Sequence, residues 1–186
     1  MALIVSIAHA IGMQRQSTYD TMPAYQSQLY CRTWWAIYVL DRRIAIESGQ
    51  PYLIQDRNTD TVLPLDLSDE WMTRFATRTE TTAELRSETE TELVRDLPPS
   101  PIPYLVAMVR YSRVAGKVWE VLYGVKATNT ASSAMVEYAD LVLCKLLDNT
   151  PRDLQYDPGI PSETQFSLRL KWQVKQSVLL FTVRAV

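Results

Sequence analysis

Apolar positions recur at helical spacing through much of the chain. Residues 2–12 carry an apolar stripe at intervals of three and four residues and stop at Gly12, which predicts a first helix. A polar loop follows as far as Pro23, a residue suited to the first turn of a helix. Residues 24–47 then predict a long second helix, which ends before Gly49.

The second helix carries apolar residues over a broad part of its surface, which predicts a central position in the fold. These residues are Leu29, Trp34, Ile37, Tyr38, Leu40, Ile44 and Ala45. Residues 52–68 show no clear period and are predicted to form an ordered loop that packs on the core.

The remaining sequence alternates between helical patterns and turn signals. Residues 66–69 are suited to cap a short helix. Threonine and glutamate dominate residues 77–97, which predicts either a solvated helix or a mobile loop. Longer helices are predicted at residues 102–124, 131–148 and 163–184. The expected fold is all-α, an irregular bundle of five to six helices with a long ordered loop after the second helix.

Length and composition fit one globular domain that covers residues 1–186. Hydrophobic residues make up 47% and charged residues 22%, which are ordinary values for such a domain. No apolar run reaches the roughly 20 residues of a membrane span, and no basic segment precedes an apolar stretch as in a signal peptide. We therefore expect an intracellular, cytoplasmic protein without a membrane partner.

Net charge, cysteine and histidine content and the absence of certain motifs limit the kinds of binding site and enzyme that the chain could be. A net charge of −2 argues against a general surface for nucleic acid, so no direct nucleic-acid partner is predicted. Cys31 and Cys144 are too few for a disulfide scaffold, and free thiols are favoured over a bridge. His9 is the only histidine and cannot build a zinc site alone. Phosphate-binding glycine loops and nucleophile elbows are absent, which argues against a covalent or nucleotide-dependent enzyme. Neither a metal nor a cofactor is expected.

The second helix holds the candidate chemistry. Trp34, Tyr38 and Asp41 are spaced to share one face, and Trp35 and Arg42 belong to a neighbouring stripe. In one interpretation Asp41 and Arg42 are structural and tie the helix to the following loop. In the other, the aromatic rings wall a cavity in which Asp41 acts as a base or an orienting carboxylate.

Two further residues allow the same pair of interpretations. His9 is either a packed helix residue or a general acid or base. Arg32 either pairs with a carboxylate or holds an anionic group of a substrate, as Arg42 also could.

The order of motifs resembles the regulatory, or middle homology, region of fungal zinc-cluster transcription factors. The motifs are Ala8-His9-Ala10-Ile11-Gly12, Arg32, Trp34-Trp35, Leu40-Asp41-Arg42, Gly49-Gln50-Pro51, Asp56, Asp60 and Leu63-Pro64. Gln14 stands where that family usually has histidine, and Gln50 replaces the arginine of its Gly-Arg-Pro. Two cysteines cannot form the family's six-cysteine zinc cluster.

Small proteins similar to this region occur as cyclases in fungal polyketide pathways, and the resemblance implies such a function. The expected enzyme closes a lactone or α-pyrone and assists release from a polyketide synthase thioester, without a cofactor. The implied catalytic residues are Asp41, His9, Arg42 and Arg32, and the implied substrate-binding residues are Trp34, Trp35, Tyr38 and Gln14. The implied partner is the synthase or its thioester-bound product.

The alternative is a non-catalytic regulatory module of a transcription factor, which would bind a small ligand or dimerise and would lie in the nucleus. The chain is either a natural small protein or an excised piece, and the first is favoured. A free-standing piece of a larger bundle exposes apolar faces, so a homodimer is predicted.

Overall fold

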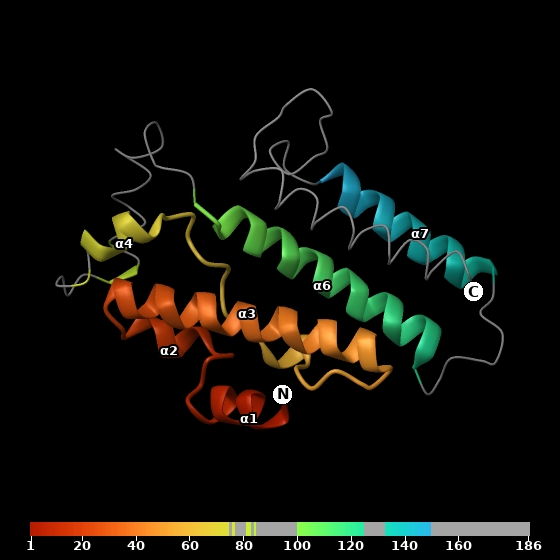
Figure 1. The fold of residues 1–186 in the computed structure, drawn as a ribbon, viewed down its shortest axis with the longest axis horizontal. Coiled ribbons are helices and arrows are strands. Elements are labelled where there is room, and N and C mark those ends of the chain that lie inside the picture. Colours follow the sequence, from red (N-terminus) through yellow and green to blue (C-terminus); the bar gives the residue numbers. More distant parts are fainter. Residues whose placement is uncertain (75, 77–80, 83, 85–99, 125–132, 150–186) are drawn as a thin grey trace. The chain divides into compact units, whose positions relative to one another are not determined.

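The structure of the chain is a computed structural model, which describes residues 1–74, 76, 81, 82, 84, 100–124 and 133–149. Within these residues the regular elements are helices, and the one strand-like pairing is an isolated bridge between Pro23 and Thr81. The helices are α1 (Ala2–Ala10), α2 (Gln16–Asp20), α3 (Ala24–Ser48), the 3-10 helix η1 (Asp56–Asn58), α4 (Asp69–Arg74), α6 (Ile102–Tyr123) and α7 (Ser133–Asp148) (Figure 1). The predicted all-α class is confirmed.

The chain divides into two compact units, Met1–Val106 and Ala107–Val186. The first holds α1 to α4 and the start of α6, and we call it the N-terminal unit. The second holds the rest of α6 and the whole of α7. On α7, Ala139 and Leu143 are buried. The single domain predicted for residues 1–186 stays a prediction.

The long periodic helices begin and end within two residues of their predicted bounds. The prediction of a polar loop between Gly12 and Pro23 was wrong in one respect, because this segment contains the five-residue helix α2. The predicted helix at 163–184 and nearly all of segment 77–97 lie outside the described residues. None of the helices in the described part combines the length and the apolar character that a membrane crossing requires.

A tight turn reverses the chain at the end of α1, where the sequence predicted that the helix stops at Gly12. The Gly12 N–H donates to the His9 carbonyl and the Met13 N–H donates to the Ala8 carbonyl, each at 3.0 Å. These two bonds form a Schellman motif, which needs a left-handed residue after the helix. Gly12 supplies it with a φ of 78°. The turn brings the following segment back beside α3.

We expect Gly12→Ala to destabilise the protein more than Gly49→Ala does. Both glycines are left-handed, with φ of 78° and 68°, so alanine costs about 1–2 kcal/mol at either position. A Cβ on Gly12 would also lie 2.7 Å from the Thr18 hydroxyl oxygen, whereas one on Gly49 meets nothing within 4 Å. The Thr18 hydroxyl donates to the Gly12 carbonyl at 2.8 Å, and its displacement adds roughly 1 kcal/mol. Urea denaturation of both variants measures the difference, and equal midpoints would contradict it.

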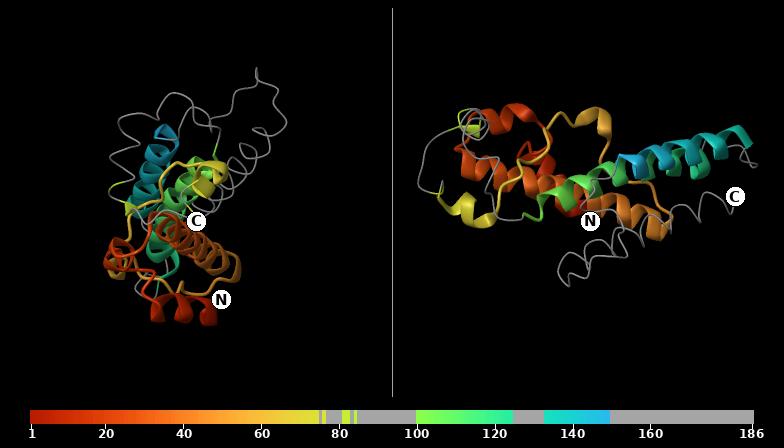
Figure 2. Two further views of the ribbon diagram at one scale, coloured as in Figure 1. Left: turned by 90° about the vertical axis from the view of Figure 1, so that its left-hand side faces the viewer. Right: turned by 90° about the horizontal axis from the view of Figure 1, so that it is seen from above.

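Helix α3 lies beside α1 and α2 in the N-terminal unit (Figure 1, Figure 2). Its buried residues recur at intervals of three and four and form one stripe rather than a broad surface. They are Ala24, Ser27, Gln28, Cys31, Trp34, Trp35, Tyr38, Asp41, Arg42 and Ala45. The prediction that Leu29, Leu40 and Ile44 share the buried surface was wrong, since each of them is exposed.

Candidate functional site

Side chains from the buried stripe of α3 hold the backbone of the segment between α3 and α4, which we call the 50–68 loop. Buried backbone N–H and C=O groups must find partners, and an irregular loop supplies only some of them itself. The loop runs antiparallel to α3, so that its first residues meet the end of the helix and its last residues meet the beginning. The polar members of the stripe provide the partners described below.

Asp41 binds the start of the loop. Its carboxylate accepts from the Leu53 N–H at 3.0 and 3.1 Å, and from the Ile54 N–H at 2.9 Å. The side chain is 3% exposed. Both carboxylate oxygens are therefore engaged by main-chain donors at a position that solvent hardly reaches.

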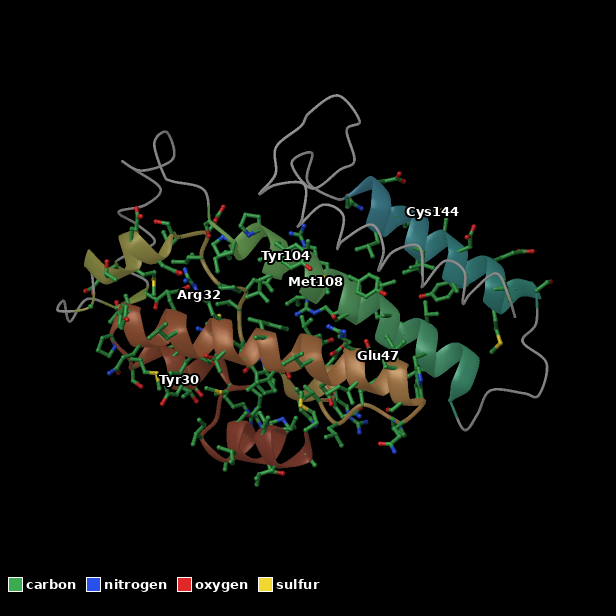
Figure 3. The ribbon with its side chains drawn as sticks, viewed as in Figure 1. Tyr30, Arg32, Glu47, Tyr104, Met108 and Cys144 are labelled. Atoms are coloured by element: carbon green, nitrogen blue, oxygen red, sulfur yellow. The ribbon has the colours of Figure 1, made fainter. Side chains whose placement is uncertain are left out.

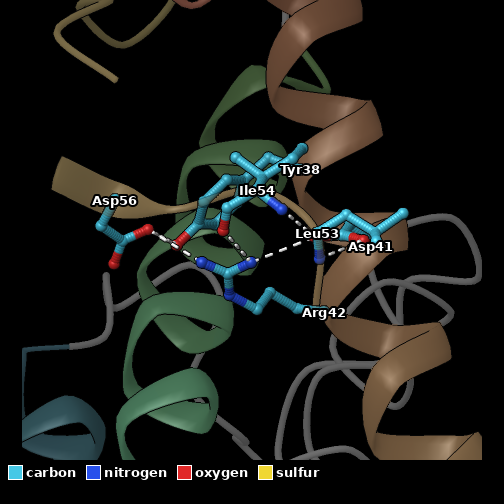
Figure 4. A network of polar contacts seen from close by, with 6 residues as sticks. All are labelled: Tyr38, Asp41, Arg42, Leu53, Ile54 and Asp56. Carbon is cyan, nitrogen blue, oxygen red and sulfur yellow. Dashed lines mark hydrogen bonds and ion pairs between the residues drawn. The ribbon is translucent and has the colours of Figure 1, made fainter. Parts of the chain in front are cut away.

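Arg42 binds the same part of the loop from the neighbouring position of the helix (Figure 4). One guanidinium nitrogen lies 3.2 Å from the Asp41 carboxylate and donates to the Ile54 carbonyl at 2.8 Å. The other pairs with Asp56 at 2.9 Å, and the Tyr38 hydroxyl donates to the same Asp56 oxygen at 2.6 Å. Arg42 is 2% exposed, so the pair with Asp41 is excluded from water.

Two aromatic rings enclose the Arg42 guanidinium. Its central carbon lies 3.6 Å from the Tyr52 ring centroid and 4.5 Å from the Tyr38 ring centroid. Rings at these distances stabilise a cation through their negative faces. Tyr38 thus contributes its hydroxyl to Asp56 and its ring to Arg42, while Tyr52 belongs to the loop itself. The arrangement is a closed cluster of charges, rings and backbone groups.

The middle of the loop is held by the next turns of α3. The Trp35 indole N–H donates to the Val62 carbonyl at 2.8 Å, and the Cys31 thiol lies 3.2 Å from the same oxygen. Further along, the Leu65 N–H donates to the Gln28 amide oxygen at 2.9 Å. Burial raises the pKa of the Cys31 thiol to about 12, so it stays protonated at neutral pH and is no nucleophile. Both cysteines are free, as predicted.

Arg32 lies away from this cluster, on the side of α3 that faces α4 (Figure 3). Its guanidinium pairs with Asp69 at 2.8 Å and donates to the Leu67 carbonyl at 2.6 Å. Asp69 is 82% exposed, which makes the ion pair a weak contribution to stability. The contact to the Leu67 carbonyl fixes the end of the 50–68 loop.

His9 and Gln14 lie at the other side of α3. The His9 ring is 5.6 Å from the Trp34 ring, centroid to centroid, and the rings are tilted by 43°. The Gln14 carbonyl accepts from the Asp60 N–H at 3.1 Å, which joins the segment after α1 to the 50–68 loop. The Trp34 indole N–H and the Gln14 side-chain oxygen are buried and have no hydrogen-bond partner among the described residues.

The structure brings together four of the eight residues singled out from sequence, Trp35, Tyr38, Asp41 and Arg42. The Trp35 ring lies edge-on to the Tyr38 ring, with 5.3 Å between the ring centroids. His9 and Trp34 form a second contact, and Arg32 and Gln14 each bind the loop separately. Sequence reasoning did not assign site roles to Tyr52, Asp56 or Gln28. Gln28 carried a usable signal, because it is a polar residue in the register of the buried stripe. Catalytic and substrate-binding roles for the eight residues stay predictions.

The polar side chains of the buried stripe of α3 bind the 50–68 loop. Each hydrogen bond of Asp41, Arg42, Trp35 and Gln28 described above goes to the loop or to a member of the same cluster. Within the described residues no group of three or more histidine, cysteine, aspartate or glutamate side chains is arranged to hold a metal ion. The hydrogen bonds described above hold the backbone of the 50–68 loop against α3.

Comparisons with known proteins agree on one class. The family described as Fungal specific transcription factor domain matches residues 1–145. An uncharacterised transcriptional regulatory protein of Schizosaccharomyces pombe is 27% identical over 122 residues, which are 66% of this chain and 13% of that protein. Cutinase transcription factor 1 alpha of Fusarium vanettenii is 22% identical over 154 residues, 81% of this chain and 15% of that protein.

A third relative has the same character. The transcriptional activator protein acu-15 of Neurospora crassa is 24% identical over 155 residues, 82% of this chain and 15% of that protein. The chain therefore spans less than a fifth of the length of these three relatives. No solved structure matches the chain.

These matches correct the function expected from sequence. The prediction of a polyketide cyclase was wrong, because the family and the relatives are regulators of transcription and none of them is named as a cyclase. The motifs of α3 and the 50–68 loop carried the resemblance to the regulatory region, and the cyclase function was implied by small proteins similar to that region. In the structure those motifs describe how the loop is anchored.

Proposed function

Because the chain belongs to the family of fungal specific transcription factor domains, we propose that it is a regulatory module of a transcription-factor-type protein. The observation that carries the proposal is the match over residues 1–145, which includes α1, α3, the 50–68 loop and α6. This is the regulatory, middle homology region, and it does not include the zinc cluster that reads DNA in such factors.

The residues support a role other than DNA contact. The chain has a net charge of −2, whereas a surface that binds DNA is rich in lysine and arginine. Its two cysteines cannot supply a six-cysteine cluster. We propose that residues 1–186 do not themselves contact DNA, and we expect the protein to work in the nucleus.

The geometry supports a module that acts through its surface. The anchored 50–68 loop has a fixed backbone, yet several of its side chains are exposed, among them Leu53 and Val62. A rigid loop with exposed side chains is a good recognition surface, because little conformational entropy is lost when a partner or effector binds. We propose that this loop contributes to the signal that the module transmits.

A reporter assay tests the proposed function. The chain is placed between a heterologous DNA-binding domain and a strong activation domain, and its output is compared with that of an inert linker of equal length. We expect the chain to change reporter expression several-fold. Arg42→Ala, which releases the loop, should abolish the difference, and Arg43→Ala, on the exposed side of the same helix, should preserve it. Output equal to that of the linker would refute a regulatory role.

A further inference from the structure

Ser100 lies two residues before α6, and its hydroxyl makes two hydrogen bonds. It donates to the Leu67 carbonyl at 3.2 Å and accepts at 3.1 Å from the N–H of Ile102, the first residue of α6. The donated bond is longer than the usual distance of about 2.7–2.8 Å between two oxygens, so it is weak. Ser100 is half-buried, and Pro101 beside it is exposed. The hydroxyl can therefore be released from Leu67 at little cost.

Arg32 of α3 binds the same carbonyl as Ser100. One terminal guanidinium nitrogen donates to the Leu67 carbonyl oxygen at 2.6 Å, so it is a close neighbour of the Ser100 hydroxyl. The other terminal nitrogen pairs with Asp69, which is 82% exposed and neutralises the cation only weakly. The third nitrogen, Nε, is buried and has no hydrogen-bond partner among the described residues. A cation with an unused donor thus lies beside the serine, and both belong to the N-terminal unit.

A phosphate on the Ser100 oxygen would suit these surroundings. It adds a charge of about −1.5 to −2 and about three strong acceptor oxygens. The planar guanidinium of Arg32 can donate to two of these oxygens at once, and the positive end of the α6 dipole favours the same anion. The Leu67 carbonyl would lose its weak bond to Ser100 and keep the shorter one to Arg32. Asp69 competes for Arg32, but its exposed carboxylate can turn to solvent at small cost.

The residue that follows Ser100 indicates which enzyme could add the phosphate. Proline-directed protein kinases modify a serine or threonine that is followed directly by proline. The sequence contains two such pairs, Ser100-Pro101 and Thr150-Pro151. Thr150 lies outside the described residues, whereas Ser100 has the neighbouring arginine that would bind the product.

We propose that Ser100 is a phosphorylation site for a proline-directed protein kinase and that Arg32 binds the phosphate. The Ser100 oxygen attacks the γ-phosphorus of ATP, the bond from this phosphorus to the bridging oxygen breaks, and ADP leaves. The hydroxyl proton passes to the catalytic aspartate of the kinase. The product joins the start of α6 to α3 through an ion pair, next to the end of the 50–68 loop. Neither the transfer nor the ion pair requires the regulatory function proposed above.

Phosphorylation of the full chain in vitro tests the site. The chain with Thr150→Ala, which removes the other serine- or threonine-proline pair, is incubated with a proline-directed kinase and ATP, and mass spectrometry identifies the modified residue. We expect phosphate on Ser100 and its loss when Ser100→Ala is added. A kinase that modifies a short serine-proline peptide in the same reaction, but leaves Ser100 of the folded chain unmodified, would overturn the proposal.

Phosphorus NMR tests whether Arg32 binds the phosphate. A guanidinium favours the doubly charged form, so the second pKa of the phosphoserine should be lower in the folded chain than in the same phosphoprotein unfolded in urea, by about half a unit or more. Arg32→Gln should remove this difference. Asp69→Asn, at an exposed position that the fold tolerates, should enlarge it, and Arg57→Gln, an exposed arginine in η1, should leave it unchanged. Equal pKa values in the folded and unfolded phosphoprotein would refute binding, as would a difference that neither Arg32→Gln nor Asp69→Asn alters.

Discussion

Arg42→Ala is expected to lower the free energy of unfolding of the N-terminal unit by about 3–5 kcal/mol, the usual cost of removing one partner from a buried ion pair. Arg42 and Asp41 are 2% and 3% exposed, so solvent cannot take over the lost contact to Asp41, whereas the other partner, Asp56, is 46% exposed. The substitution leaves the Ile54 carbonyl without its guanidinium donor and empties the space between Tyr38 and Tyr52. Urea denaturation followed by far-UV circular dichroism measures the change.

The next residue of the helix provides the control. Arg43 pairs with Glu47 four residues on, and the two side chains are 55% and 59% exposed. Such a pair contributes about 0.3–0.5 kcal/mol, so Arg43→Ala should hardly move the denaturation midpoint. Hydrogen exchange adds a local readout, because the Leu53 and Ile54 amides that bind Asp41 should lose protection in Arg42→Ala. Similar midpoints for both arginine variants would show that Arg42 does not hold the loop.

Alanine at Trp34 or at Trp35 is expected to cost about 3–5 kcal/mol, because each substitution leaves a large cavity in the buried stripe. Both tryptophans are 0% exposed. Phenylalanine distinguishes the two positions. The Trp35 indole N–H donates to the Val62 carbonyl, whereas the Trp34 indole N–H has no partner among the described residues. Trp35→Phe should therefore be the more destabilising by roughly 1 kcal/mol.

The phenylalanine pair is an internal control, since both variants remove the same atoms from adjacent residues of one helix. Denaturation midpoints of Trp34→Phe and Trp35→Phe, measured under one set of conditions, give the difference directly. A larger loss at Trp34 would mean that its N–H has a partner that matters in solution, such as a bound water. Equal losses would mean that the bond to Val62 contributes nothing to stability.

The long helices of this fold could be predicted from sequence because their patterns are local. Gly12 and Gly49 end α1 and α3 as expected, and both have the positive φ that glycine allows. Helix α2 was missed for a physical reason. Its first residue, Gln16, donates its N–H to Asp60 at 2.7 Å, and its side chain accepts from the Val62 N–H at 3.0 Å. These partners lie more than forty residues away in the sequence, so the contacts that support α2 produce no periodic pattern within residues 16–20.

The candidate site could be predicted in part for a similar reason. The spacing of Tyr38 and Asp41 on one helix face placed them together, and the structure adds Arg42 to them. Their partners on the loop depend on the path of residues 50–68, which no local pattern specifies. The same path explains why Leu40 is exposed while Asp41 is buried. The buried stripe of α3 contains polar side chains because they form hydrogen bonds with the backbone of the loop. Hydropathy alone predicts that Leu40 is buried and Asp41 is exposed.

The anchoring of the 50–68 loop also bears on how such a module can diverge. Leu53 and Val62 bind side chains of α3 through their backbone groups, and their own side chains are 46% and 43% exposed. A mutation at either position changes the outer surface without altering the atoms that the helix binds. Single substitutions at these two positions can therefore alter the exposed surface of the loop, while the hydrogen bonds from α3 preserve its conformation. The conformation of the loop thus depends on α3, whereas the chemistry of its outer surface depends on its own side chains.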